Sequence, residues 1–168
     1  DCVIGEVNRG WAIARTTLTN ERVTMSSGSA FGFGVEAILR QASRLDGDDI
    51  SDGSSGDFSR RLGALVAEAQ SLRLMAHRSA LLSIAGTDHG AVASLRKLLG
   101  AEHEQRVQEL GLAMLGAEGA TTEGGAAQWT GGVLSTRCLT IAGGTSEVQR
   151  NVIGERILGL PRDPEPAG

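Results

Sequence analysis

Apolar residues recur at three- and four-residue spacing along much of this chain, and this helical period is the strongest constraint on its fold. The clearest stretch places its apolar side chains on one stripe: Leu62, Leu65, Val66, Ala69, Leu72 and Ala76. Charged residues such as Arg60, Glu68 and Arg73 fall off that stripe, as on an amphipathic helix. Only 3% of the residues are aromatic, whereas strands are enriched in aromatic and β-branched side chains. The sequence therefore predicts an all-α protein.

The predicted helices are few and long. After a lead-in over residues 1–10, we expect a first helix from about Trp11 to Arg44, a second through the stripe, and a third from about Gly90 to Leu115. Two more should flank residues 143–144, and loops are expected over 46–57 and 116–125. Long amphipathic helices with short connections are typical of an antiparallel four-helix-like bundle. Glycines 28, 32 and 34 predict close packing of the first helix against another helix or a ligand.

Size and charge narrow the class of protein. A chain of 168 residues is long enough for one domain with a core. Its formal net charge is −4 and its basic residues are scattered, which disfavours a nucleic-acid or anionic-membrane surface. No apolar run approaches the roughly 20 residues of a membrane span. Cys2 and Cys138 lie far apart and read as reduced, buried thiols of a cytoplasmic protein. Because the chain begins at Asp1, we expect it to be a fragment of a longer protein.

No metal site is predicted. The acidic stretch Asp46–Asp57 superficially suggests a calcium loop, but Ile50 stands where an oxygen ligand is needed and the closing Glu is absent. His103-Glu104 begins like a zinc-protease motif, yet Val107 occupies the position of the second histidine. The histidines are therefore interpreted as surface or packing residues.

The segment Arg137–Asn151 is the most informative part of the sequence, and its residues predict a helix, a two-glycine elbow and a second helix. Gly143 and Gly144 can adopt positive φ and allow another molecule to approach the backbone. Thr145 is a good N-cap for the second helix, and Glu147 falls in its first turn, where the helix dipole favours negative charge. The helix is expected to stop before the Gly-Leu-Pro sequence at 159–161.

This ordered run, closed by Gly-Glu-Arg-Ile-Leu-Gly-Leu-Pro at 154–161, resembles the C-terminal signature of the acyl-CoA dehydrogenases, especially those of actinobacteria. The likeness is strong from Trp129 to Arg162 and looser elsewhere. It implies that residues 1–168 are the C-terminal helical domain of a flavoenzyme whose upstream helical and β domains are absent here. The implied reaction is FAD-dependent α,β-desaturation of an acyl-CoA thioester in lipid metabolism. The implied partners are acyl-CoA, an electron-transfer acceptor and further subunits in a homo- or hetero-oligomer, so the isolated domain should be inactive.

The resemblance also implies roles for individual residues. Many members place the catalytic carboxylate at the position of Gly143, which cannot serve, whereas a minority place it on the first helix at the position of Glu21. Glu21 is therefore the candidate base, with Arg22 beside it near the acyl thioester. Gly143 and Gly144 would contact the substrate, the amide of Gly143 donating to the thioester carbonyl. Family positions matching Thr145 and Glu147 contact the adenosine half of FAD.

Structural interpretations of the same residues remain open. Glu-Arg on a helix is usually a solvated pair, and Thr145 can serve as a cap alone.

Two departures from the family pattern concern flavin binding between subunits. Many members follow the first helix with a Tyr-x-x-x-Arg-x-x-Phe-Gly run, which the acidic loop replaces here. A family glutamine ahead of a G-G-x-G turn aligns with Ala113, ahead of Gly116-Ala117-Glu118-Gly119. Both family features bind the flavin of a neighbouring subunit. The alternative function is therefore a catalytically silent partner subunit of a hetero-oligomeric enzyme.

Overall fold

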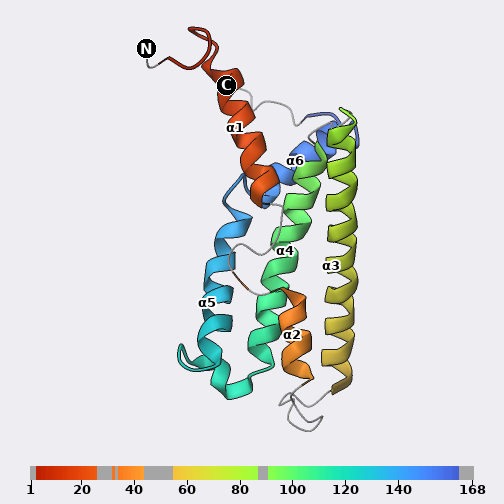
Figure 1. The fold of residues 1–168 in the computed structure, drawn as a ribbon, viewed down its shortest axis with the longest axis vertical. Coiled ribbons are helices and arrows are strands. Elements are labelled where there is room, and N and C mark those ends of the chain that lie inside the picture. The colour runs from red at the N-terminus through yellow and green to blue at the C-terminus, as the bar shows by residue number, and fades with distance from the viewer. Residues whose placement is uncertain (1–2, 26–31, 33, 44–54, 87–90, 163–168) are drawn as a thin grey trace.

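The computed structural model describes residues 3–25, 32, 34–43, 55–86 and 91–162, and every regular element in these ranges is helical (Figure 1). The α-helices are α1 (Gly10–Met25), α2 (Val35–Ala42), α3 (Ser55–Ile84), α4 (Ala91–Ala113), α5 (Ala126–Thr136) and α6 (Ser146–Arg156). Two 3₁₀ helices, η1 (Gly116–Ala120) and η2 (Arg137–Thr140), precede and follow α5. The described residues contain no strand, which confirms the all-α prediction.

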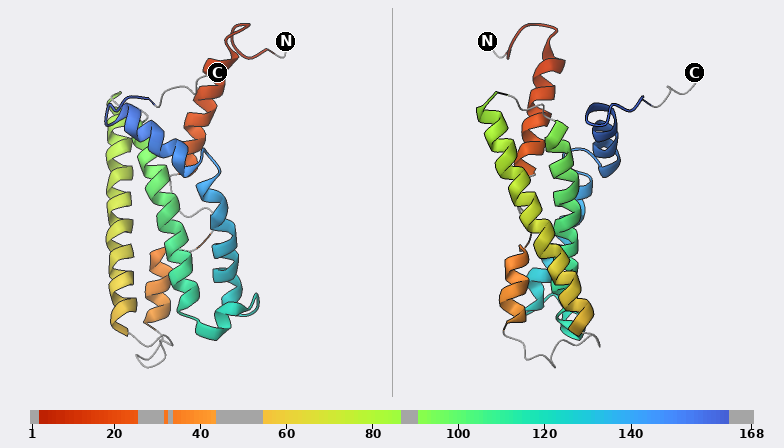
Figure 2. Two further views of the ribbon diagram at one scale, coloured as in Figure 1. Left: turned by 180° about the vertical axis from the view of Figure 1, so that it is seen from behind. Right: turned by 90° about the vertical axis from the view of Figure 1, so that its right-hand side faces the viewer.

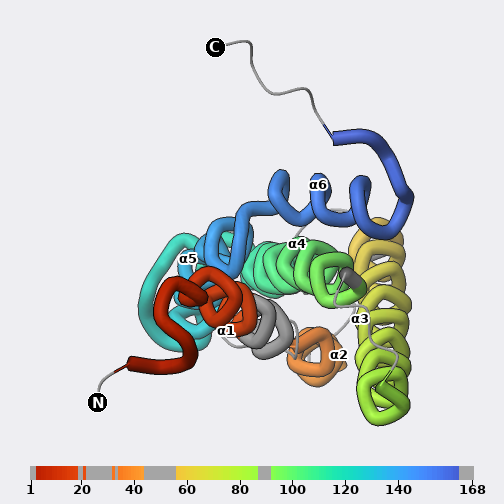
Figure 3. Tube along the Cα trace, turned by 90° about the horizontal axis from the view of Figure 1, so that it is seen from above, coloured from red at the N-terminus to blue at the C-terminus, as the bar shows by residue number. Residues whose placement is uncertain are grey.

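The helices form an antiparallel bundle. Figures 1 and 2 show α1 and α2 running in one direction, α3 returning, α4 running down beside it and α5 returning again. Helix α4 contacts α1, α2, α3, α5 and α6, so it is the central helix of the fold. Helix α6 crosses one end of α4, on a different side from α1 (Figure 3). The predicted bundle is confirmed, with its first helix divided into two pieces.

The single first helix expected over residues 11–44 is wrong. Helix α1 ends at Met25, and α2 begins only at Val35, after Gly34 in an extended conformation with φ −72° and ψ 168°. Glycine costs up to about 1 kcal/mol per site inside a helix, and Gly32 and Gly34, which precede α2, are not helical. A side chain at Gly32 would place its Cβ 2.5 Å from Cδ of Gln108 on α4, which confirms the close packing expected at this glycine. Gly28 lies outside the described residues.

Other boundaries shift by less. Residues 55–57 of the expected acidic loop form the first turn of α3, and residues 46–54 lie outside the described ranges. The expected loop over 116–125 contains η1. Its end is marked by a hydrogen bond from the Thr121 amide to the Glu118 carbonyl, three residues earlier, as is typical of a 3₁₀ helix. The prediction for α4 is correct to within two residues at each end.

The interior of the bundle is divided into an apolar and a polar region. The apolar core joins α2, α3, α5 and the C-terminal half of α4, with eight buried residues: Val35, Ile38, Leu62, Leu65, Val107, Leu110, Met114 and Trp129. The N-terminal half of α4 buries the apolar residues Ala93 and Leu98 together with several polar side chains, including Ser94, Arg96 and Lys97. Because burying polar groups is costly unless they are satisfied, this half of α4 is where specific polar contacts are expected.

Two further sequence predictions concern the surface. Cys138 is exposed, so the expectation that it is a buried thiol is wrong, while Cys2 lies outside the described residues. Cys138 lies in η2, where the neighbouring Leu139 is the buried residue. None of the helices in the described ranges is long and apolar enough to span a bilayer.

Candidate functional site

The elbow between η2 and α6 has the backbone that its glycines predict. Gly143 has φ 68° and Gly144 has φ 95°, in the left-handed region that side chains disfavour. A Cβ at Gly144 would also stand 2.6 Å from Nε2 of Gln149. The conformation at residue 144 therefore favours glycine, and any side chain there would also displace the amide of Gln149.

Two buried side chains hold the carbonyl groups of this elbow. Lys97 on α4 donates from Nζ to the carbonyl of Gly144 at 2.6 Å. Gln149 on α6 donates from Nε2 to the carbonyls of Gly143 and Gly144 at 2.9 and 3.3 Å. Lys97 is 2% exposed and Gln149 is 0% exposed. The elbow is therefore fixed from behind by one residue distant in sequence and one nearby.

The orientation of these carbonyls also determines where the following amides point. Trans peptide units are planar, with C=O and N–H on opposite sides, and the described residues contain no cis peptide bond. The carbonyls of Gly143 and Gly144 point toward Gln149 and Lys97. The amides of Gly144 and Thr145 therefore point away from them.

The start of α6 confirms both local predictions made for it. Thr145 has the extended conformation of an N-cap, and its hydroxyl accepts a 3.3 Å hydrogen bond from the amide of Val148. Glu147 lies in the first turn and is exposed. A hydrogen bond from its own backbone amide lowers the pKa of Glu147, and the Thr145 side chain and the charges of Arg150 and Lys97 act in the same direction. Glu147 is thus an ionised acceptor at a helix N-terminus.

These residues fit the adenosine half of a dinucleotide such as FAD. Ribose hydroxyls need acceptors, which the Glu147 carboxylate supplies, and phosphate oxygens favour the N-terminal end of a helix. Two further polar atoms at the start of α6, Oγ of Ser146 and Oε1 of Gln149, are buried and have no partner among the described residues. Both atoms are shielded from solvent, so the exposed carboxylate of Glu147 is the group that this helix start offers to a dinucleotide.

Glu21 lies on α1 and is exposed, while the side chain of Arg22 lies outside the described residues. The C-terminal end of α1 is level with the elbow along the bundle (Figures 1 and 2). Helices α1 and α6 pack on different sides of α4, so α4 connects the two candidate locations (Figure 3). The convergence of Glu21 and the elbow on one substrate atom stays a prediction.

Sequence reasoning assigned no role to Lys97 and Gln149, which hold the elbow, or to Glu104 farther along α4. Burial raises the pKa of Glu104 to about 7, and its Oε2 has no partner in the described part of the chain. Lys97 and Glu104 are seven residues apart on α4, which places them two turns apart on the same side of that helix. The sequence did contain one sign that Lys97 could be buried, because it lies between the apolar residues Leu95 and Leu98.

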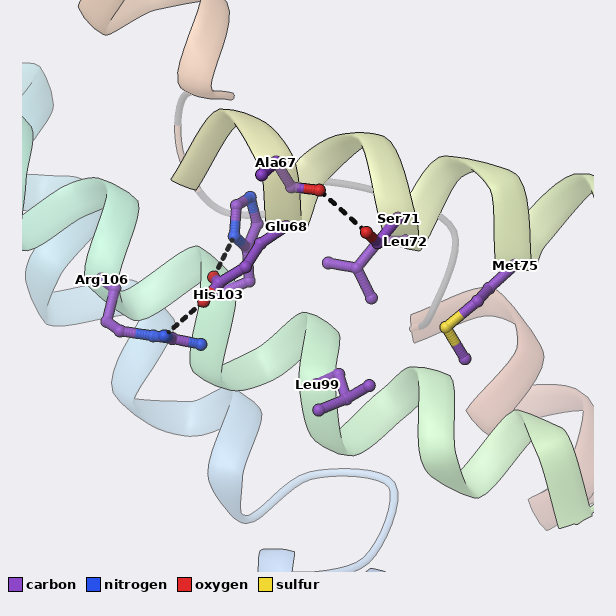
Figure 4. Close-up of a pocket in the computed structure, with 8 residues that line it drawn as sticks. All are labelled: Ala67, Glu68, Ser71, Leu72, Met75, Leu99, His103 and Arg106. Atoms are coloured by element: carbon purple, nitrogen blue, oxygen red, sulfur yellow. Dashed lines mark hydrogen bonds and ion pairs between the residues drawn. The ribbon is translucent and has the colours of Figure 1, made fainter. Parts of the chain in front are cut away.

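A separate cavity of about 250 Å³ lies between α3 and α4 (Figure 4). Glu68 binds two residues of α4 there: its Oε2 lies 3.1 Å from Nδ1 of His103, and its Oε1 accepts from Nη1 of Arg106 at 2.7 Å. Leu72, Met75 and Leu99 supply apolar walls. None of the elbow residues lines this cavity, and His103 is a buried packing residue, as expected.

Comparisons with known proteins identify the family of the chain. Residues 8–158 match the family model "Acyl-CoA dehydrogenase, C-terminal domain". Acyl-CoA dehydrogenase FadE34 of Mycobacterium tuberculosis is 43% identical over 162 residues, which are 96% of this chain and 21% of the relative. Acyl-CoA dehydrogenase IpdE1 of Mycolicibacterium smegmatis is 32% identical, over 96% of this chain and 39% of the relative. The chain thus spans less than half the length of these relatives.

Solved structures show the same fold. A variant of the Tcur3481-Tcur3483 steroid ACAD superposes with a TM-score of 0.76 at 25% identity, covering 95% of this chain and 42% of that chain. The ChsE4-ChsE5 complex from Mycobacterium tuberculosis gives a TM-score of 0.69 at 25% identity, covering 95% and 43%. The chain belongs to the acyl-CoA dehydrogenase family, and residues 8–158 are its C-terminal domain.

Proposed function

We propose that this chain is the C-terminal part of an FAD-dependent enzyme that desaturates an acyl-CoA thioester between Cα and Cβ. The observation that carries the proposal is the elbow, where two glycines with positive φ precede a helix that begins with a threonine cap and an ionised glutamate. Because these two residues have no side chain, a bound thioester or dinucleotide could approach the backbone closely there. Residues 1–168 act as one domain, together with upstream helical and β domains.

Glu21 is the proposed base that removes the α-proton of the thioester. Its carboxylate is exposed on α1, so a bound acyl thioester can reach it there and transfer its α-proton to a carboxylate oxygen. The amide of Gly143 donates to the thioester carbonyl and stabilises the negative charge that develops on its oxygen. Arg22 supports this site from the same helix. FAD, when bound, supplies the acceptor for the β-hydrogen, which leaves as hydride.

Thr145 and Glu147 are the proposed contacts of the adenosine half of FAD. Glu147 accepts from ribose hydroxyls, and the Thr145 hydroxyl, which already caps α6, keeps the helix start in place. The substrate class is a CoA thioester of a steroid-like or branched acid, because the superposed Tcur3481-Tcur3483 structure is a steroid ACAD. An electron-transfer acceptor reoxidises the enzyme.

The second candidate function is a silent partner subunit in a hetero-oligomer. Two superposed structures, Tcur3481-Tcur3483 and ChsE4-ChsE5, are named as pairs of chains. Ala113, which replaces a family glutamine that binds a neighbour's flavin, is exposed at the last residue of α4. The assembly in this case is a hetero-oligomer in which a related chain carries the missing flavin contacts.

A flavin spectrum of the full-length protein separates the two functions. We expect the protein, purified with its partner chains, to show the absorption of bound FAD and to lose it when a steroid-derived or branched acyl-CoA is added without oxygen. Bleaching that survives Glu21→Gln in this chain would assign the chemistry to the partner. A complex without flavin would contradict the enzymatic proposal.

A further inference from the structure

We propose that Lys97 and Gln149 are positioning residues, which hold the elbow so that the amides of Gly144 and Thr145 face the bound ligand. The inference rests on the proposed function and extends it from the amide of Gly143 to the next two amides of the elbow, which it assigns to thioester and flavin. It adds two side chains that do not themselves touch substrate. Their contacts are to the elbow carbonyls, at 2.6 Å from Lys97 and 2.9 and 3.3 Å from Gln149.

Gln149 acts at short range. Its side-chain amide packs against Gly144, so closely that a Cβ on residue 144 would lie 2.6 Å from Nε2 of Gln149. One NH₂ group reaches both elbow carbonyls, which locks two successive peptide planes relative to each other. Because each amide points opposite to the preceding carbonyl, fixing these planes also fixes the amides of Gly144 and Thr145.

Lys97 acts across the fold. It is 47 residues from Gly144 in sequence, so its hydrogen bond ties the elbow to the central helix. A charged donor on the Gly144 carbonyl polarises that peptide unit and makes the amide of Thr145 a stronger donor. The charge of Lys97 also reaches Glu147. A lysine that is 2% exposed carries a desolvation cost, which these contacts to the elbow offset.

The test compares Lys97→Met, Lys97→Arg and His103→Leu in the full-length protein with its partners. Methionine keeps the length of the side chain and removes the charge and the donor. Arginine restores both. His103 is also buried on α4 but bonds to Glu68 on α3, so His103→Leu controls for lost stability without touching the elbow.

We expect Lys97→Met to lower kcat by roughly 10²-fold with KM little changed, as for a group displaced from its transition-state position. Hydrogen exchange of residues 141–150 should become about tenfold faster, because a charge-assisted hydrogen bond is lost. Lys97→Arg should recover part of both losses. His103→Leu should lower the melting temperature and leave turnover per bound flavin unchanged.

The outcomes separate this inference from the proposed function. Unchanged exchange at the elbow in an active Lys97→Met protein overturns the positioning role and leaves the proposed function standing. An equal loss of kcat in His103→Leu also overturns it, since the effect would then follow from stability. If the wild-type complex neither binds FAD nor turns over acyl-CoA, the proposed function fails. Faster elbow exchange in Lys97→Met would then still support the hold of Lys97 on the elbow.

Discussion

The ring of Trp129 on α5 occupies the space beside Gly111 on α4 that a methyl group at residue 111 would need. The same indole donates from Nε1 to Oε1 of Gln41 on α2 at 2.9 Å. One side chain therefore fixes α5 against both α4 and α2. Trp129 is 3% exposed and belongs to the apolar core, so a side chain at Gly111 would displace a residue of that core.

Gly111→Ala is expected to destabilise the protein, because the indole ring must move or the helices must separate. Overpacking of this kind costs about 1–3 kcal/mol, and the melting temperature should fall by several degrees. Gly100→Ala is the matched control, since it lies on the same helix and nothing stands within 4 Å of a Cβ there. That change should be neutral or stabilising by up to about 1 kcal/mol. Equal melting temperatures for the two variants would contradict the packing argument.

Gly144→Ala should damage the elbow more than the fold. Residue 144 has φ 95°, and alanine in the left-handed region costs about 1–2 kcal/mol in addition to displacing Gln149. We expect reduced FAD retention in the full-length protein, measured from the flavin absorption per chain. Gly154→Ala on α6 serves as the control, because its Cβ would make an ordinary 3.6 Å contact with Leu160. Full flavin content in Gly144→Ala would show that the elbow tolerates distortion.

Glu21→Gln in the full-length complex should leave FAD bound and lower turnover by about 10²- to 10⁴-fold or more. Arg22→Ala should have a smaller and less specific effect. Stopped-flow reduction of the flavin by substrate measures the chemical step directly. Undiminished reduction in Glu21→Gln would remove Glu21 from the mechanism.

The double change Glu21→Gln with Gly143→Glu tests the two carboxylate positions together. A glutamate at residue 143 must adopt φ 68°, at a cost of about 1–2 kcal/mol, but it restores a carboxylate at the elbow. We expect partial recovery of flavin reduction relative to Glu21→Gln alone. A double variant that binds FAD and is no faster than Glu21→Gln would argue against convergence of the two positions.

Glu104 should make the stability of the protein depend on pH. Burial raises its pKa to about 7 from the ordinary value of 4.5, so the folded state keeps a proton that the unfolded state releases between these values. Stability therefore falls as the pH rises through this window. Glu104→Gln should match the wild type at pH 4 and exceed it by about 1–2 kcal/mol at pH 8, after allowance for partial exposure. Urea unfolding at both pH values measures this difference. If the free energy of unfolding changes equally with pH in the wild type and in Glu104→Gln, the prediction is wrong.

The ratio of FAD to chain tests assembly. If this chain lacks contacts to its neighbour's flavin, each lost charge-assisted hydrogen bond weakens binding by roughly 1.5–3 kcal/mol. We expect little FAD in the full-length protein expressed alone, and about one FAD per two chains when a related partner chain is co-expressed. Full occupancy in an active homotetramer would discard the hetero-oligomer and leave a rearranged pyrophosphate site.

The sequence predicted the local features that depend on neighbouring residues. The positive φ at both elbow glycines, the Thr145 cap and the position of Glu147 follow from backbone and capping preferences. The separation of α1 from α2 was missed, although Gly32 and Gly34, which are not helical, were noticed, because apolar residues recur at helical spacing on both sides of them.

Contacts between distant segments were not predictable in this way. Nothing near Lys97 in the sequence indicates that its amine reaches Gly144, because that contact depends on how α6 crosses α4. The raised pKa of Glu104 likewise depends on burial by helices from other parts of the chain. Such features require the packed bundle.

Helix α6 contributes only polar residues, Ser146 and Gln149, to the buried interior. It packs chiefly on α4, where Arg150 on α6 forms an ion pair with Glu102 at 2.6 Å between partly exposed side chains, a contact that stabilises little. The apolar core contains no residue of α6. Apart from this ion pair, the buried hydrogen bond from Lys97 to Gly144 is the polar tie described between α4 and this end of the chain. We therefore expect helix α6 and the elbow to open as a unit, once that bond breaks, while the rest of the bundle stays folded. On heating, we expect the full-length protein to release bound FAD at a lower temperature than that at which its helices melt.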